Sequence, residues 1–181
     1  APLWQGKVDA TVAGDCDLRD KDAVLSSLSL DGDTISTSGA VDARPWLQDI
    51  SQFLGQRQDL KIIRYREFLH HLSVQDGRYN ITDLVVRGLD TDWWGNGWIG
   101  LDGSIDLGLK VKLPAGFQPD LGDLSFLAAA LRGEDGRIAL DLSLTGRAAR
   151  PAVNLNLTQA KEAARDAVEE EAKKGINGLL D

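Results

Sequence analysis

The stretch Ile105-Asp106-Leu107-Gly108-Leu109-Lys110-Val111-Lys112-Leu113 has aliphatic residues at every odd position and Asp, Gly or Lys at every even one. Successive side chains of a β-strand point to opposite faces, so this stretch predicts a strand with one wholly apolar face. The same period of two recurs in residues 138–145 and, after Pro151, in residues 153–157. Together the three stretches predict a sheet whose apolar face must be hidden from water.

Four Asp-Gly pairs lie beside alternating stretches and predict tight hairpin turns, because both residue types tolerate the positive φ that such turns need. The pairs are Asp31-Gly32, Asp76-Gly77, Asp102-Gly103 and Asp135-Gly136. Shorter strands are predicted at residues 8–12, 28–30, 79–81 and 84–86, with a bend or bulge at Thr82-Asp83. Hairpins of this kind favour antiparallel pairing.

Three segments break the period of two. Residues 45–54 place large apolar side chains at helical spacing after Pro45, and residues 124–131 do so over a shorter length. A C-terminal helix is predicted over residues 158–175, capped by Thr158 and ended by Gly175. At 181 residues, the chain is expected to form a single domain over residues 1–181. The predicted class is α+β and mainly β: a twisted, largely antiparallel sheet that forms a groove or half-barrel, with two short helices and the C-terminal helix.

Composition excludes several classes of protein. A formal charge of -8 repels phosphate backbones, so no nucleic-acid partner is expected. The basic residues are scattered along the sequence and form no polybasic run for an anionic membrane. The single cysteine, Cys16, rules out an internal disulfide. The chain has no methionine and begins Ala1-Pro2, so we expect a segment cut from a longer protein whose membrane anchor lies elsewhere.

The sequence offers no convincing catalytic or metal site. Gly95, Gly97 and Gly100 have the spacing of a dinucleotide fingerprint, but they lie in a strand-like stretch and are interpreted as bulges or flat spots. The acidic run over residues 15–22 lacks the central glycine and closing glutamate of a calcium loop. His70 and His71 are neighbours and should point to opposite faces of a strand. We therefore expect no enzyme activity, no catalytic residue, no metal and no cofactor.

What remains is the apolar face of the predicted sheet. It can be a conventional packed core or a groove that receives acyl chains, and the residues alone leave both open. The candidate groove residues are Ile105, Leu107, Leu109, Val111, Leu113, Ile138, Leu140, Leu142, Leu144, Val153, Leu155 and Leu157. Trp93, Trp94 and Trp98 are candidates for the rim of such a groove, for hairpin packing, or for stacking against a sugar.

The order of these features resembles a known family. The run Phe68 to Leu84, the segment Gly100 to Leu107, the passage from Gly146 through Pro151 to Val153, and the final Ala/Glu/Lys-rich helix carry the resemblance. The chain resembles the C-terminal region of the AsmA-like family, envelope proteins of Gram-negative bacteria that are related to TamB. The resemblance covers residues 60 to 181 well and the first 60 loosely.

The resemblance implies a periplasmic segment of a protein anchored in the inner membrane through an N-terminal helix that lies outside this chain. It implies an elongated β-groove, similar to those of repeating β-groove lipid-transfer proteins, that takes part in phospholipid transport or in outer-membrane assembly and integrity. Its partners would be phospholipid acyl chains and an outer-membrane assembly protein. Two other interpretations stay open: a scaffold module that binds such a partner by strand addition, and a carbohydrate-binding module.

Overall fold

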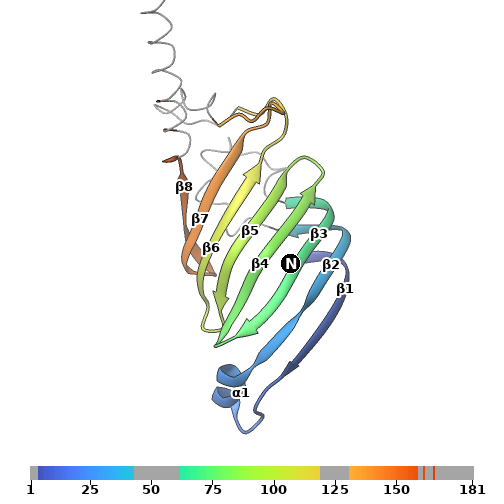
Figure 1. The fold of residues 1–181 in the computed structure, drawn as a ribbon, viewed down its shortest axis with the longest axis vertical. Coiled ribbons are helices and arrows are strands. Elements are labelled where there is room, and N and C mark those ends of the chain that lie inside the picture. Colours follow the sequence, from blue (N-terminus) through green and yellow to red (C-terminus); the bar gives the residue numbers. More distant parts are fainter. Residues whose placement is uncertain (1–3, 43–61, 119–130, 159–160, 162–164, 166–181) are drawn as a thin grey trace, which may run out of the picture.

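The computed structural model describes residues 4–42, 62–118, 131–158, 161 and 165. In these residues the protein is mainly β, with eight antiparallel strands in one open sheet. The strands are β1 (Trp4–Asp15), β2 (Ser29–Asp42), β3 (Ile62–Gln75), β4 (Arg78–Gly88), β5 (Asp92–Gly100), β6 (Ser104–Lys112), β7 (Ala139–Arg147) and β8 (Arg150–Asn156). Figure 1 shows them side by side in chain order, with β1 at one edge and β8 at the other.

Three of the four Asp-Gly pairs form the predicted turns between antiparallel segments. Asp76 and Gly77 join β3 to β4 with positive φ at both residues (54° and 69°). Asp102 and Gly103 join β5 to β6, with Gly103 at a φ of 84°. Asp135-Gly136 is also such a turn: it reverses the chain between Arg132 and Ile138, which form an isolated antiparallel bridge just before β7.

The fourth predicted turn is wrong. Asp31 and Gly32 lie inside β2, where Gly32 is opposite Val12 of β1 and Leu72 of β3. A glycine is needed at this position because a Cβ atom would collide with the backbone of Thr11. The Asp-Gly pair therefore marks a close approach between strands and not a reversal of the chain.

Bulges interrupt the alternation in the first half of the sheet. The register shifts at Ser38 in β2, the extra residue opposite the step from Gly6 to Lys7, at Arg66 in β3, and between Ile81 and Leu84 in β4. The last shift is the predicted bulge at Thr82-Asp83, and Asp83 has a φ of 53°. Each bulge adds a residue, so the side chains that face the core change from odd to even positions or back.

One helix lies between β1 and β2, and the sequence patterns did not predict it. This helix, α1 (Lys21–Ser27), begins after Asp20, whose carboxylate accepts a hydrogen bond from the Ala23 backbone N–H at 2.8 Å. Asp20 is thus a helix cap. Asp17, in the same acidic run, accepts from the backbone and the side chain of Arg19.

The predicted helices fall mostly on residues that the structure does not describe. The predicted helix at 45–54 lies outside the described residues, and so does that at 124–131 apart from its last residue. Of the predicted C-terminal helix the structure describes only Thr158, Lys161 and Arg165, which are helical, so that helix stays a prediction. The Lys161 backbone N–H donates to the Leu157 carbonyl at 2.9 Å, which is the spacing of an α-helix.

Candidate functional site

Nine of the twelve residues proposed to line a groove lie in β6, β7 and β8 and share one face of the sheet, whereas Leu113, Ile138 and Leu157 lie just outside these strands. Strand register places Leu107 opposite Leu144, Leu109 opposite Leu142, and Val111 opposite Leu140. In β8, Val153 lies opposite Leu144 and Leu155 opposite Leu142. The alternation quoted from the sequence therefore continues across strands, and three strands contribute to one apolar surface.

This surface extends across the rest of the sheet. Trp93 of β5 lies opposite Val111 and also opposite Val86 of β4, which in turn lies opposite Phe68 of β3. Gly95 leaves room for Leu84 and Leu109, which would be 3.0 and 2.9 Å from a Cβ atom at that position. Phe68 lies opposite Ser36 of β2, and Ser36 lies opposite Val8 of β1. We call this side of the sheet the apolar face, and it contains further members at Val12, Leu30, Thr34, His70, Leu72, Val74, Tyr79, Ile81, Ile99 and Ile105.

Exposure along the apolar face differs between its two ends. Ile105, Leu140 and Leu144 are each 2% exposed, whereas Val8 and Val12 of β1 are 45% and 44% exposed. On the strands between, half-buried residues such as Leu72 and Leu84 alternate with buried ones such as Ser36, so exposure rises mainly at β1. The face is closed at β6 and β7 and open to solvent at β1.

Eight of the twelve proposed groove residues are buried: Ile105, Leu107, Val111, Leu113, Ile138, Leu140, Leu142 and Leu144. The other four, Leu109, Val153, Leu155 and Leu157, are half-buried. Phe117 and Leu131, which precede β7, pack against the same cluster. A ligand could contact the buried eight only after this packing opened, so the accessible part of the apolar face lies nearer to β1.

The three tryptophans do not form one rim. Trp93 belongs to the apolar face, is buried, and donates from Nε1 to the Thr91 hydroxyl at 2.8 Å. Trp94 and Trp98 point to the opposite face because of strand alternation. The Arg78 guanidinium lies 4.3 Å from the ring centroid of Trp98, and that of Arg87 lies 5.8 Å from Trp94. Each outward ring already has a cation over one side, which leaves less surface for a stacked sugar.

The two histidines separate as the sequence predicted. His71 lies on the outer face between two carboxylates, with Nε2 3.2 Å from Asp31 and Nδ1 2.9 Å from Asp33. The hydrogen bond to Asp33, with the nearby Asp31 charge, raises the pKa of His71. His70 lies on the apolar face and is 6% exposed, and burial lowers its pKa. The two adjacent histidines thus lie in opposite environments, His71 between carboxylates on the outer face and His70 buried on the apolar face.

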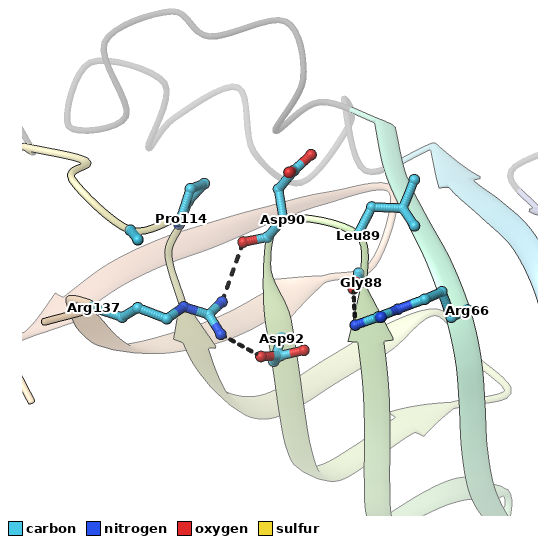
Figure 2. A pocket seen from close by; sticks show the side chains of 8 residues that line it. Arg66, Gly88, Leu89, Asp90, Asp92, Pro114 and Arg137 are labelled. Carbon is cyan, nitrogen blue, oxygen red and sulfur yellow. Dashed lines mark hydrogen bonds and ion pairs between the residues drawn. The ribbon is translucent and has the colours of Figure 1, made fainter. Parts of the chain in front are cut away.

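A cavity of about 270 Å³ lies at one end of the sheet, by the turn between β4 and β5. Figure 2 shows Arg137 reaching toward Asp90 and Asp92 on one side, and Arg66 reaching toward Gly88 on the other. Arg137 donates to Asp92 Oδ2 (2.6 Å) and to the carbonyls of Leu113 (2.8 Å), Lys112 (3.0 Å) and Asp90 (3.1 Å). With four acceptors bound by one side chain, Arg137 ties the ends of β5 and β6 together. Four of the eight residues that line this cavity are charged, so it suits an acyl chain less well than the apolar face does.

No group of three or more His, Cys, Asp or Glu side chains is placed to hold a metal ion in the described part of the chain. Cys16 is exposed and is not in a disulfide. Of the helical residues that the structure describes, none belongs to a helix long and apolar enough to cross a membrane.

Sequence reasoning missed two features of this site. One is the burial gradient, which depends on what packs over each strand and which alternation cannot reveal. The other is the buried imidazole of His70. Alternation places His70 on the apolar face only after the bulge before Phe68 is taken into account, and the sequence did not reveal that bulge.

Comparison of the chain with family models, curated proteins and solved structures finds no match.

Proposed function

We propose that this chain is a non-enzymatic segment of an AsmA-like envelope protein that binds phospholipid acyl chains on the apolar face. In this proposal the sheet, with the predicted helices, forms a groove or half-barrel in the periplasm, and its parent protein is anchored in the inner membrane. The segment takes part in phospholipid transport, or in outer-membrane assembly and integrity.

One observation carries the proposal: the apolar face crosses all eight strands of an open sheet and becomes exposed toward β1. A closed core would not leave Val8 and Val12 nearly half exposed on the same face that buries Leu107 and Leu140. Each methylene that an acyl chain buries contributes about 0.8 kcal/mol, so even a short contact with this open part supplies affinity without any chemical step.

The experiment compares two substitutions in β1. Val12→Asp puts a charge on the open part of the apolar face, whereas Thr11→Asp puts the same charge on the opposite face of the same strand. Both positions are exposed, so neither change should prevent folding. Purified proteins are extracted with solvent and their lipid is quantified by mass spectrometry, and transfer of a fluorescent phospholipid between vesicles is measured.

We expect Val12→Asp to lose most lipid and most transfer activity, and Thr11→Asp to retain both. Equal lipid content and equal transfer in the two variants would rule out binding on this face. Absence of lipid from the wild-type protein, together with no transfer, would rule out the proposed function.

A second candidate function is supported by the edge of the sheet. β1 is the outermost strand of the described sheet, is 12 residues long, and contains no proline. A long unprotected edge can accept a further strand through backbone hydrogen bonds. In this alternative the segment is a scaffold for an outer-membrane assembly protein, and Ala10→Pro, which removes an N–H from β1, would weaken partner binding while lipid content stays unchanged.

A further inference from the structure

Three polar side chains are buried in the middle of the apolar face, where β2 and β3 pair. They are Thr34, Ser36 and His70, which are 7%, 1% and 6% exposed. The Ser36 hydroxyl is hydrogen-bonded to the Lys7 carbonyl and to the Tyr65 hydroxyl. His70 differs, because neither Nδ1 nor Nε2 makes a hydrogen bond of normal geometry, although the Thr82 backbone lies near enough to oppose the lowering of its pKa.

An imidazole without a hydrogen bond of normal geometry is costly at a buried position, since both ring nitrogens lose water and regain at most a weak contact with the Thr82 backbone. Phenylalanine or leucine would fill the same space without that cost. The surroundings are suited to such residues, because the rings of Phe68 and Tyr79 lie edge-on to His70 at centroid distances of 6.5 and 5.3 Å. A stability argument alone therefore gives no reason for histidine here, and unsatisfied buried groups of this kind are typical of functional positions.

The two neighbouring rings also hold the imidazole in one orientation on the apolar face. Burial lowers the pKa of His70, which favours the neutral ring, with one N–H donor and one acceptor nitrogen. The N–H of a neutral imidazole in apolar surroundings therefore favours an uncharged hydrogen-bond acceptor on the ligand. A carboxylate or phosphate would have to be buried with its charge beside an uncharged ring, which is unfavourable.

An acyl lipid has one neutral acceptor close to its chains. The chains themselves carry no polar atom, and the charged head group stays in water, so the ester carbonyl is the polar atom nearest to an apolar contact surface. We propose that His70 recognises bound lipid by donating a hydrogen bond from its imidazole N–H to an ester carbonyl oxygen. This inference rests on the proposed function and assigns one residue of the apolar face to selection of the lipid.

The neighbours of His70 provide a surface along which the adjoining chain can lie. Tyr79, Leu72 and Leu84 are half-buried on the same face, on β3 and β4. They lie between the closed region at β6 and β7 and the open region at β1. His70 is itself only 6% exposed, so a chain that enters from β1 reaches its ring nitrogens once the adjacent Phe68 and Tyr79 side chains move aside.

The test compares two lipids that differ only at the proposed contact. One is a diacyl phospholipid with ester bonds, and the other is its dialkyl ether analogue with the same chains and head group. Binding of each lipid is measured for the wild-type protein, for His70→Phe and, as a matched control, for His71→Phe. His71 is the adjacent histidine on the opposite face and should play no part in the contact.

We expect the wild-type protein and His71→Phe to prefer the ester lipid by roughly three- to tenfold, the ratio that one neutral hydrogen bond gives. His70→Phe should bind both lipids with equal affinity, and it should also unfold at a higher denaturant concentration than the wild type. If His70→Phe keeps the preference, or if the wild type binds both lipids equally, the recognition role of His70 is wrong and the proposed function stands. If the wild type binds neither lipid, the proposed function fails as well.

A second measurement needs no substitution. In wild-type protein labelled with ¹⁵N-histidine, the ester lipid should shift the ring resonances of His70 and the ether analogue should not. Equal shifts with both lipids, or none with the ester lipid, would contradict the hydrogen bond.

Discussion

His71 Nδ1 lies 2.9 Å from Asp33 Oδ1, and the two residues are direct register partners on neighbouring strands β3 and β2. Asp31, two residues earlier on the same face, lies 3.2 Å from the other ring nitrogen. A protonated His71 therefore compensates two carboxylates that would otherwise repel each other on the outer face of the sheet.

This arrangement predicts a pH-dependent stability. The Asp33 hydrogen bond raises the pKa of His71, so the folded state holds the proton more tightly than the unfolded chain, whose histidine titrates near about 6.5. The stabilisation is complete below that unfolded pKa and is lost as the pH rises through the higher folded pKa. Urea titrations at about pH 5.5 and about pH 8.5 should show a midpoint difference between wild type and His71→Gln at the lower pH only. A difference of the same size at both pH values would contradict the ion pair.

The second half of the fold could be predicted from the sequence because it has no bulge. From Ser104 to Asn156 the apolar side chains keep a strict period of two within each strand, and the register pairs them as the alternation predicts. In the first half the bulges shift that period. In β3, Ile63 and Tyr65 face the core from odd positions, but His70 and Val74 do so from even ones.

The exposure of each residue on the apolar face was less predictable from the sequence than the positions of the strands. Alternation assigns Leu107 and Val12 to the same kind of face, yet one is 3% and the other 44% exposed. Which part of an apolar face is covered depends on contacts between segments far apart in the sequence. The same holds for the basic residues, which are scattered along the sequence. Arg137 reaches Asp92, 45 residues away, only through the fold, so this ion pair could not be predicted from the sequence.

The burial gradient predicts very different costs for equivalent truncations. Leu140→Ala removes a side chain that is 2% exposed and should destabilise the fold by about 2–5 kcal/mol, because it leaves a cavity. Val12→Ala, at a position that is 44% exposed, should cost less than about 1 kcal/mol. Urea unfolding at constant pH measures both. Similar losses would mean that the two ends of the apolar face are equally buried in solution.

Arg137 should be far more important for stability than other surface arginines. Its replacement by alanine leaves Asp92 and three carbonyls without their donor and should cost about 2–3 kcal/mol. Arg137→Lys should recover little, because an ammonium group cannot reproduce the planar fork. The control variant is Arg87→Ala. Arg87 forms an ion pair with Glu67 that is 4.0 Å long and half exposed, so its loss should change stability by about 0.5 kcal/mol or less. If lysine restored full stability at position 137, charge and not geometry would be the important property.

Two glycines on paired strands should respond in opposite ways to the same substitution. Gly97 has a φ of 144°, and a Cβ atom there would collide with the backbone of Asp106 on β6. Gly97→Ala should therefore destabilise the protein by about 1–3 kcal/mol.

Gly108 lies on β6 opposite Asn96, and a Cβ atom would meet only the Asn96 carbonyl at an ordinary 3.6 Å. Gly108→Ala should stay within about 0.5 kcal/mol of the wild type in a urea titration, or stabilise it slightly by restricting the unfolded chain. Equal losses at the two positions would indicate that β5 and β6 exclude an added side chain on either face of the sheet, whereas a loss at Gly97 alone identifies its backbone conformation and its close approach to Asp106 as the cause.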